Sequence, residues 1–427
     1  MSATFDVGGF NKYAEDVDMI PPGSPCAICK GSKNLCGKDR CPLMIKFYSR
    51  AKAKNLINSL DIEGMSPPSI FVGRYGYPKV DIGPLVPPMM GDTSIMDTPE
   101  LWVGKSIEEF VDFRFSLIRG KHRIDAVDFH KAGKIIDQTR DLALSENPLE
   151  VEAAFQKRPV GRLVLDDEVQ PFGPSARLKT LDVGNTRYEQ HVEKAFYDTD
   201  LKATEAVRSL YSDGVLVSKI QKAFSVGAFG IDKNRKFVPT RWSITAVDDI
   251  LGKSLLSTTK YNPVIEDWRV YDWYQLDNRW SILLMPVSWR YELIEAWFPN
   301  TVWNPLGRDV EIISSYEFYN GRKKYAEIGG CYYAARFAVN ELLQSEGRQA
   351  GAVIFREAHP GYIMPVGVWN VRENVRAALK TDPHRFETLN DALNHVGSKM
   401  SIPVNQWIAN SGILKDMFTQ RRLDDYV

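Results

Sequence analysis

Four of the five cysteines lie close together near the N-terminus, at Cys26, Cys29, Cys36 and Cys41. Thiols at these spacings can reach one tetrahedral centre, and Zn²⁺ prefers thiolate ligands in closed structural sites. The short connecting loops favour a metal over two disulfides. The sequence therefore predicts a structural Zn²⁺ site, with a redox or cluster-binding site as the alternative. Only Cys331 lies elsewhere, so the chain does not resemble a cysteine-dense secreted scaffold and we expect a reducing environment.

Outside the cysteine cluster, no catalytic constellation stands out. The six histidines are scattered, and the sequence contains neither a Gly-x-Ser-x-Gly elbow nor a Walker loop. Cys331 could have a lowered pKa at a helix N-terminus, but a buried and inert cysteine is the commoner case. The polar clusters to test first for chemistry are Asp248 with Asp249, and Arg356 and Glu357 with His359. Both clusters could equally serve as ion-pair or helix-cap residues.

The strongest local charge lies between Cys26 and Lys54, where eight lysines and arginines face Asp39 as the only acid. This pattern predicts a surface that contacts phosphates, although a solvated face of no specific function is the alternative. Arg74, which lies between glycines, is a further candidate, with a simple turn as the competing interpretation. The predicted phosphate contacts are Lys30, Lys33, Lys38, Arg40 and Arg74.

The overall composition is that of an ordinary globular protein. The 427 residues contain 44% hydrophobic and 25% charged residues, and 54 basic side chains balance 54 acidic ones. Attraction for nucleic acid must therefore come from a local patch. The length suggests two or three folding units. The N-terminus lacks a signal-peptide pattern and no apolar run is long enough to cross a bilayer, so we expect a cytoplasmic protein with no membrane partner.

In the first half, helical signals alternate with stretches rich in proline and glycine. A capping box from Ser106 to Glu109 predicts a helix that ends near Gly120. Further helices are predicted over residues 134–144, 149–157 and 187–212, and short strands over 69–72 and 80–82. This half should be mainly helical, with extended interruptions.

The second half is rich in tryptophan and arginine between residues 268 and 303. This mixture could stack bases and hold phosphates, but core packing explains it more simply. The apolar runs 280–289 and 351–355 are typical of buried strands, and helices are predicted over 332–343 and from Asn370 to Leu379. We therefore predict an α+β fold whose body contains a mixed or antiparallel sheet.

The C-terminal residues match a peptide motif that binds sliding clamps. Gln420 is followed by an aliphatic residue, Leu423, and by an aromatic residue, Tyr426, each three positions further on. In that motif the pattern forms one helical turn whose apolar side chains fill a pocket, while the glutamine amide hydrogen-bonds beside it. The last position usually carries a second aromatic residue, and Val427 departs from that rule, which puts the affinity in question.

With these features together, the whole chain resembles the archaeal Nre family of DNA-repair proteins. The resemblance rests on the four cysteines with the following Pro42–Met44, on Phe71–Pro78, on Val238–Asp249 and on Gln420–Val427. It implies an N-terminal zinc finger, a C-terminal PIP motif that binds a PCNA-type sliding clamp, and a role in DNA-damage repair. It implies no reaction.

The predicted organisation has four parts: an N-terminal arm (1–25), a zinc module with its following helix (26–62), an α+β body (63–410, with a possible subdivision near 235–245) and a clamp-binding tail (411–427). The leading hypothesis is a repair factor that the clamp recruits and that holds DNA without reading its sequence. The alternatives are an enzyme that acts on nucleic acids or nucleotides in the body, and a zinc-stabilised RNA-binding protein. We expect the zinc to fix the N-terminal module rather than to present a recognition helix.

Overall fold

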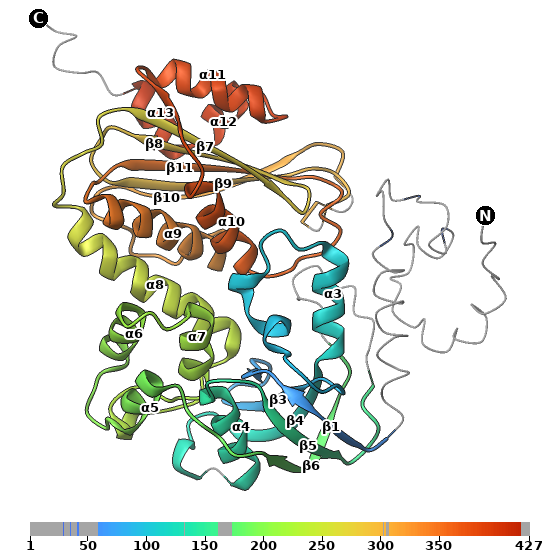
Figure 1. Ribbon diagram of the computed structural model, residues 1–427. Coiled ribbons are helices and arrows are strands. Elements are labelled where there is room, and N and C mark those ends of the chain that lie inside the picture. The colour runs from blue at the N-terminus through green and yellow to red at the C-terminus, as the bar shows by residue number, and fades with distance from the viewer. Residues whose placement is uncertain are drawn as a thin grey trace, which may run out of the picture.

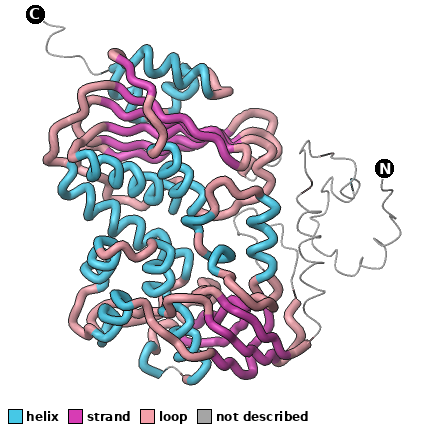
Figure 2. The backbone as a smooth tube through the Cα atoms, viewed as in Figure 1, coloured by secondary structure: helices cyan, strands magenta, loops and turns pink. Residues whose placement is uncertain are grey.

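Two six-stranded sheets lie at opposite ends of the molecule, with helices between them (Figures 1 and 2). The computed structural model describes residues 29, 35, 41, 59–131, 133–160, 173–301, 303–304 and 307–419. The predicted α+β class is confirmed, and each sheet is mixed because it contains one parallel pair among antiparallel ones. No helix in these ranges is both long and apolar enough to cross a membrane.

The first sheet has the strand order β1-β5-β6-β4-β3-β2. Its strands are β1 (Asp61–Ser66), β2 (Ile70–Val72), β3 (Lys79–Val86), β4 (Ile118–Asp125), β5 (Leu149–Phe155) and β6 (Ser175–Val183). Its helical layer contains α4 (Lys134–Leu144), α5 (Gln190–Tyr197), α6 (Ala203–Ser212) and α7 (Val217–Ser225). Apolar side chains of these strands and helices form one core, which contains Ile82, Val151 and Ile220.

Two sequence predictions in this half are wrong in detail. Residues 149–155 form strand β5 rather than a helix, and their side chains alternate between buried and exposed positions, as in a half-buried strand. The predicted helix over 187–212 is two helices, α5 and α6, which are separated at residues 198–202. The predicted helix after Ser106 is confirmed as α3 (Ile107–Ser116), complete with its capping box, although it ends earlier than expected.

The second sheet has the order β10-β9-β11-β8-β7-β12. Its strands are β7 (Trp268–Gln275), β8 (Asn278–Met285), β9 (Arg290–Trp297), β10 (Glu311–Glu317), β11 (Gly351–Ala358) and β12 (His384–Phe386). One face is covered by α9 (Gly330–Glu346) and α10 (Trp369–Leu379). The other face is covered by α11 (Leu389–Lys399), α12 (Val404–Asn410) and α13 (Gly412–Thr419) (Figure 1).

The predicted core role of the tryptophans is confirmed for most of them. Trp268, Trp280, Trp289 and Trp297 are buried in or beside the second sheet. Trp273 is partly buried against the same core, and Trp303 is exposed over 44% of its surface.

Helix α8 (Thr240–Thr259) runs through the middle of the molecule (Figure 1). Its Val247 and Leu251 belong to the core of the first sheet, whereas Leu256 belongs to the core between the second sheet and α9. The same helix therefore contributes to both cores, and its N-terminal turns lie where the two halves meet.

Candidate nucleic-acid interface

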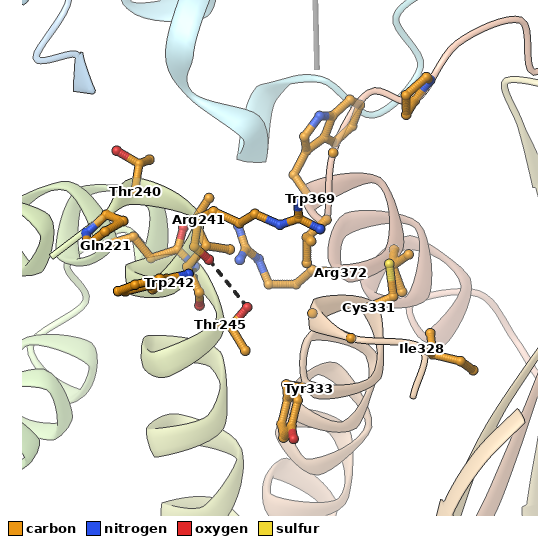
Figure 3. Close-up of a pocket in the computed structure, with 18 of the residues that line it drawn as sticks. Gln221, Thr240, Arg241, Trp242, Thr245, Ile328, Cys331, Tyr333, Trp369 and Arg372 are labelled. Carbon is orange, nitrogen blue, oxygen red and sulfur yellow. Dashed lines mark hydrogen bonds between the residues drawn. The ribbon is translucent and has the colours of Figure 1, made fainter. Parts of the chain in front are cut away.

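A cleft of about 1780 Å³ lies between the two halves of the molecule. Its walls are the loop between β2 and β3, the N-terminal turns of α8, the loop that leads into α9, and the beginning of α10. Figure 3 shows Arg241 of α8 and Arg372 of α10 in the space between these helices. A cleft of this size, lined by residues from both halves, is the default candidate for ligand binding.

Direct contacts join the β2–β3 loop to the beginning of α8. The Val72 N–H donates a hydrogen bond to Thr240 Oγ1 over 2.8 Å. The rings of Tyr77 and Trp242 also pack with their centroids 5.2 Å apart. The sequence segments Phe71–Pro78 and Val238–Asp249 thus form one wall of the cleft, although about 160 residues separate them in the chain.

Helix α9 closely approaches α8 on the other side of the cleft. A Cβ atom on Gly330, the first residue of α9, would lie only 3.0 Å from Thr245 Oγ1 and 2.9 Å from Val368 Cγ2. A side chain at position 330 would therefore require Thr245 or Val368 to shift. The preceding loop places Lys323, Lys324 and Tyr325 at the rim.

The cleft is strongly basic although the whole chain is neutral. Fourteen of the described lining residues are lysine or arginine, against six that are aspartate or glutamate. Within the described part of the chain, no carboxylate forms an ion pair with four of these cations: Arg74, Arg241, Lys323 and Lys324. A concave surface with an excess of positive charge concentrates its field and attracts anions such as phosphate groups.

Exposed aromatic side chains accompany these cations. Tyr75, Trp242, Trp303 and Tyr325 all line the cleft, and between 44% and 70% of each residue's surface is exposed. The Arg74 guanidinium lies 5.1 Å from the centre of the Tyr75 ring, as in a cation–π contact. Exposed rings beside free cations can stack on bases while the cations hold the backbone.

A second group of cations surrounds Asp97. Arg114 and Lys222 pair with this buried carboxylate at 2.8 and 3.2 Å. Burial opposes ionisation of Asp97, but the two cations outweigh it and its pKa is lowered. Next to Arg114, burial and the neighbouring positive charge lower the pKa of Arg119 to about 9. Bringing negative charge to this part of the cleft would relieve the repulsion between Arg114 and Arg119.

The Asp248–Asp249 cluster takes part in ion pairs that join helices. Arg372 Nη1 lies 2.9 and 3.2 Å from the carboxylate oxygens of Asp248, and Gln221 also donates to that carboxylate. Burial raises the pKa of Asp248 to about 6, against the attraction of Arg372. Asp249 pairs with Arg336 and Lys253. These contacts join α8 to α9 and α10.

The second predicted cluster is also part of the framework. Arg356 pairs with Glu295 at 2.7 Å and lies over the ring of Trp280. The fully buried Glu357 accepts hydrogen bonds from the N–H groups of Ser401 and Ile402, and it contacts His359 at 2.9 Å. Burial raises the pKa of Glu357, but these hydrogen bonds outweigh that effect and lower it. The cluster therefore holds the segment between α11 and α12 against β11.

Cys331 lines the cleft near the beginning of α9 but is not an activated nucleophile. Burial and the nearby Glu295 raise the pKa of its thiol to about 12. The thiol therefore stays protonated at neutral pH, in agreement with the inert interpretation from the sequence.

The structure places Arg74 in the cleft, whereas most other predicted site residues lie outside the described ranges. This applies to Cys26, Cys36, Lys30, Lys33, Lys38, Arg40, Gln420, Leu423, Tyr426 and Val427. Of the other cysteines, Cys29 is buried and Cys41 is partly exposed. Sequence reasoning missed Arg241, Lys323 and Lys324. The run of three cations at 322–324 was a visible signal for two of them.

Two family models match the chain. The model described as "Archaeal Nre, N-terminal" matches residues 35–304, and the one described as "Archaeal Nre, C-terminal" matches residues 317–426. The first match includes Cys36, Cys41 and most of the cleft, and begins after Cys26 and Cys29. The second match extends into the tail.

Three curated proteins are similar over most of their length. "DNA repair protein NreB" of Archaeoglobus fulgidus is 42% identical over 391 residues, which cover 91% of this chain and 97% of that protein. "DNA repair protein NreA" of the same organism is 38% identical and covers 86% of this chain and 92% of its own length. "DNA repair protein NreA" of Haloferax volcanii is 36% identical and covers 78% and 81%, respectively. No solved structure matches the chain.

Proposed function

The chain belongs to the archaeal Nre family, and from that premise we propose that it is a DNA-repair factor that holds single-stranded DNA in the basic cleft. The names of its relatives support the role in repair. The observation that carries the binding site is the excess of cations over carboxylates in a cleft of a neutral chain. Such a local surface supplies the phosphate attraction that the overall charge does not.

The exposed rings favour a single strand over a duplex. In a duplex the bases are stacked inside, whereas a single strand can place its bases on aromatic side chains. Tyr75, Trp242 and Tyr325 are exposed within the same cleft as Arg241 and Lys324. Binding of this kind tolerates any sequence because every base has an aromatic face.

The described carboxylates of the cleft favour binding over acid–base chemistry. Five of the six described carboxylates pair with arginine or lysine: Asp81, Asp97, Asp249, Glu295 and Glu327. These pairs keep the carboxylates engaged with cations. The cleft is therefore best suited to hold an anionic polymer.

Photo-crosslinking tests where the strand lies. The full-length protein is irradiated with single-stranded DNA in which bromouracil replaces thymine, and crosslinked peptides are identified by mass spectrometry. We expect crosslinks at Tyr75, Trp242 or Tyr325. Tyr261 and Tyr197 serve as internal controls, because they are 86% and 66% exposed but lie outside the cleft. Crosslinks at these controls and none in the cleft would contradict the proposed site.

We also propose that a PCNA-type sliding clamp recruits the protein through the tail. The motif residues Leu423 and Tyr426 would fill the apolar pocket of the clamp. Replacing both with alanine should abolish binding in a pull-down with purified clamp. Replacing the intervening Asp424 and Asp425 with alanine is the matched control and should leave binding intact. Equal binding by both variants would show that the tail is not the clamp-binding segment.

The four N-terminal cysteines support a further proposal, a structural Zn²⁺ site. The residues that would hold the ion are Cys26, Cys29, Cys36 and Cys41, and the thiolates would supply a closed tetrahedral site. We expect Cys36→Ser to lower the zinc content of the purified protein and to make residues 26–62 sensitive to protease. If the variant lost DNA binding while this segment stayed folded, a finger that contacts DNA would be the better interpretation.

A further inference from the structure

Three side chains that can bind a metal converge on the sheet face opposite the one that α9 and α10 cover. They are Asp272 of β7, His384 of β12 and His395 of α11, and their possible ligand atoms all lie within 4.8 Å of one another. Figure 1 shows α11 on this outer face of the second sheet. None of the three residues lines the cleft.

Strand pairing and a helix cap bring the three residues together. Strand β12 pairs with β7 in antiparallel orientation, with His384 opposite Val270. Asp272 lies two residues beyond Val270 and therefore occupies the diagonal position on the same face. The chain then turns into α11, where the Thr388 side chain accepts a hydrogen bond from the Asp391 N–H and caps the helix. This helix places His395 over the strand pair.

The carboxylate of Asp272 is already oriented toward the two imidazoles. The buried Ser281 donates a hydrogen bond to Asp272 Oδ1 over 2.7 Å. The other oxygen, Oδ2, lies 2.6 Å from Nε2 of His395 and 3.9 Å from Nε2 of His384. Metal-binding carboxylates are typically fixed by such an outer hydrogen bond while the second oxygen faces the ion.

We propose that Asp272, His384 and His395 bind a divalent transition metal, with Zn²⁺ as the best fit. Two imidazoles and one carboxylate are ligands that Zn²⁺ accepts, and water can complete a tetrahedral shell. Ligand atoms around tetrahedral Zn²⁺ are about 3.3 Å apart, so only a small movement is needed. The His384 side chain can make this movement because it is 55% exposed. The bound ion fastens the edge strand β12 and helix α11 to β7.

Cobalt titration of the full-length protein separates this site from the N-terminal cysteines. Thiolate ligands give Co²⁺ an intense sulfur-to-metal charge-transfer band, which imidazole and carboxylate ligands do not give. We expect His384→Gln to bind one equivalent of Co²⁺ less than the unmodified protein, while the charge-transfer band keeps its intensity. Equal stoichiometry in the two proteins would overturn the proposal.

His191→Gln is the matched control. His191 is also exposed and lies 3.4 Å from a carboxylate, that of Asp213, and no second imidazole joins this pair among the described residues. We expect this variant to bind the same number of Co²⁺ ions as the unmodified protein. A loss equal to that of His384→Gln would mean that isolated surface histidines account for the signal, and would overturn the site.

Two further variants test the site by the strength of metal binding. The conclusion then does not depend on whether His384→Gln folds. Ser281→Ala keeps all three ligands but removes the hydrogen bond to Asp272, so the affinity for Co²⁺ should fall by about 10–100-fold. Zn²⁺ bound at this site should raise the melting temperature in addition to any rise that the cysteine site gives. Asp272→Asn should abolish this additional rise. Unchanged affinity in Ser281→Ala, together with an unchanged Zn²⁺ response in Asp272→Asn, would contradict the proposal.

Discussion

Replacing Lys323 and Lys324 with alanine should weaken binding of single-stranded DNA and make it less sensitive to salt. Both lysines are exposed at the rim of the cleft, and no described carboxylate pairs with them. They are therefore available to phosphates. The loop that carries them is held independently, because Arg322 pairs with Glu327 at 2.7 Å.

The size of the effect follows from counterion release. Each phosphate contact on a single strand contributes about −0.7 to the slope of log affinity against log salt concentration. Loss of two contacts should therefore reduce the magnitude of the slope by about 1.4. The electrostatic contribution vanishes at about 1 M salt in this treatment. Relative to that reference, a slope difference of about 1.4 corresponds at about 150 mM salt to about a 14-fold loss of affinity, or about 1.6 kcal/mol.

Fluorescence anisotropy of a labelled oligonucleotide, measured from about 50 to about 300 mM KCl, gives both the affinity and the slope. The control variant replaces Lys157 and Lys179, which are exposed and lie outside the cleft. This control removes the same two positive charges as the cleft variant. It therefore tests whether the lysines must lie in the cleft to affect binding. The reasoning is refuted if the control loses as much affinity as the cleft variant, or if the cleft variant keeps the original slope.

Three further predictions concern the walls of the cleft and their supports. The pKa of Asp248 is raised to about 6 from 3.8, so its stabilising contribution is fully present below about pH 4 and is lost as the pH rises through 6. The unfolding free energy of the protein relative to Asp248→Asn should thus fall by about 2.5 kcal/mol between about pH 4 and pH 7.5, and urea titrations that show no change would contradict this. Cys331, with a pKa of about 12, should react with iodoacetamide at about pH 8 roughly a thousandfold more slowly than a free cysteine; mass spectrometry showing equal rates would disprove its inertness. Glu357→Ala leaves the N–H groups of Ser401 and Ile402 without their acceptor, and the unfolding free energy should fall by about 2–6 kcal/mol; a loss below about 1 kcal/mol would show that water replaces the carboxylate.

The sequence correctly predicted helices and strands that depend on interactions between residues close together in the chain. The Ser106 side chain and Glu109 form the capping box that the sequence indicated, and α3 begins there. The continuous apolar run from Gly351 to Phe355 lies in the centre of a sheet, as predicted. These patterns succeed because the residues that decide the structure are neighbours in the chain.

The helix predicted over 149–157 is wrong because the apolar and polar side chains of this segment alternate, as in a strand. Val151, Ala153 and Phe155 point into the core, whereas Glu150 and Glu152 are exposed. Glutamate and alanine favour helices in isolation, but pairing with β1 and β6 overrides that preference.

The binding surfaces could be predicted only in part because distant segments build them. Arg74 was identified from its glycine neighbours, but nothing in the sequence places it in the same cleft as Lys324, about 250 residues later. The same holds for the histidine pair. His384 and His395 lack the spacing of a metal motif, and they converge with Asp272 only through strand pairing and the docking of α11.

The position of α8 in both cores makes the two halves interdependent in folding. A fragment that ends before Thr240 would keep the first sheet but lose Val247 and Leu251, which complete its apolar interior. A fragment that begins after Thr259 would lack Leu256 beneath the second sheet. We therefore expect that neither half folds as a self-sufficient unit without this helix.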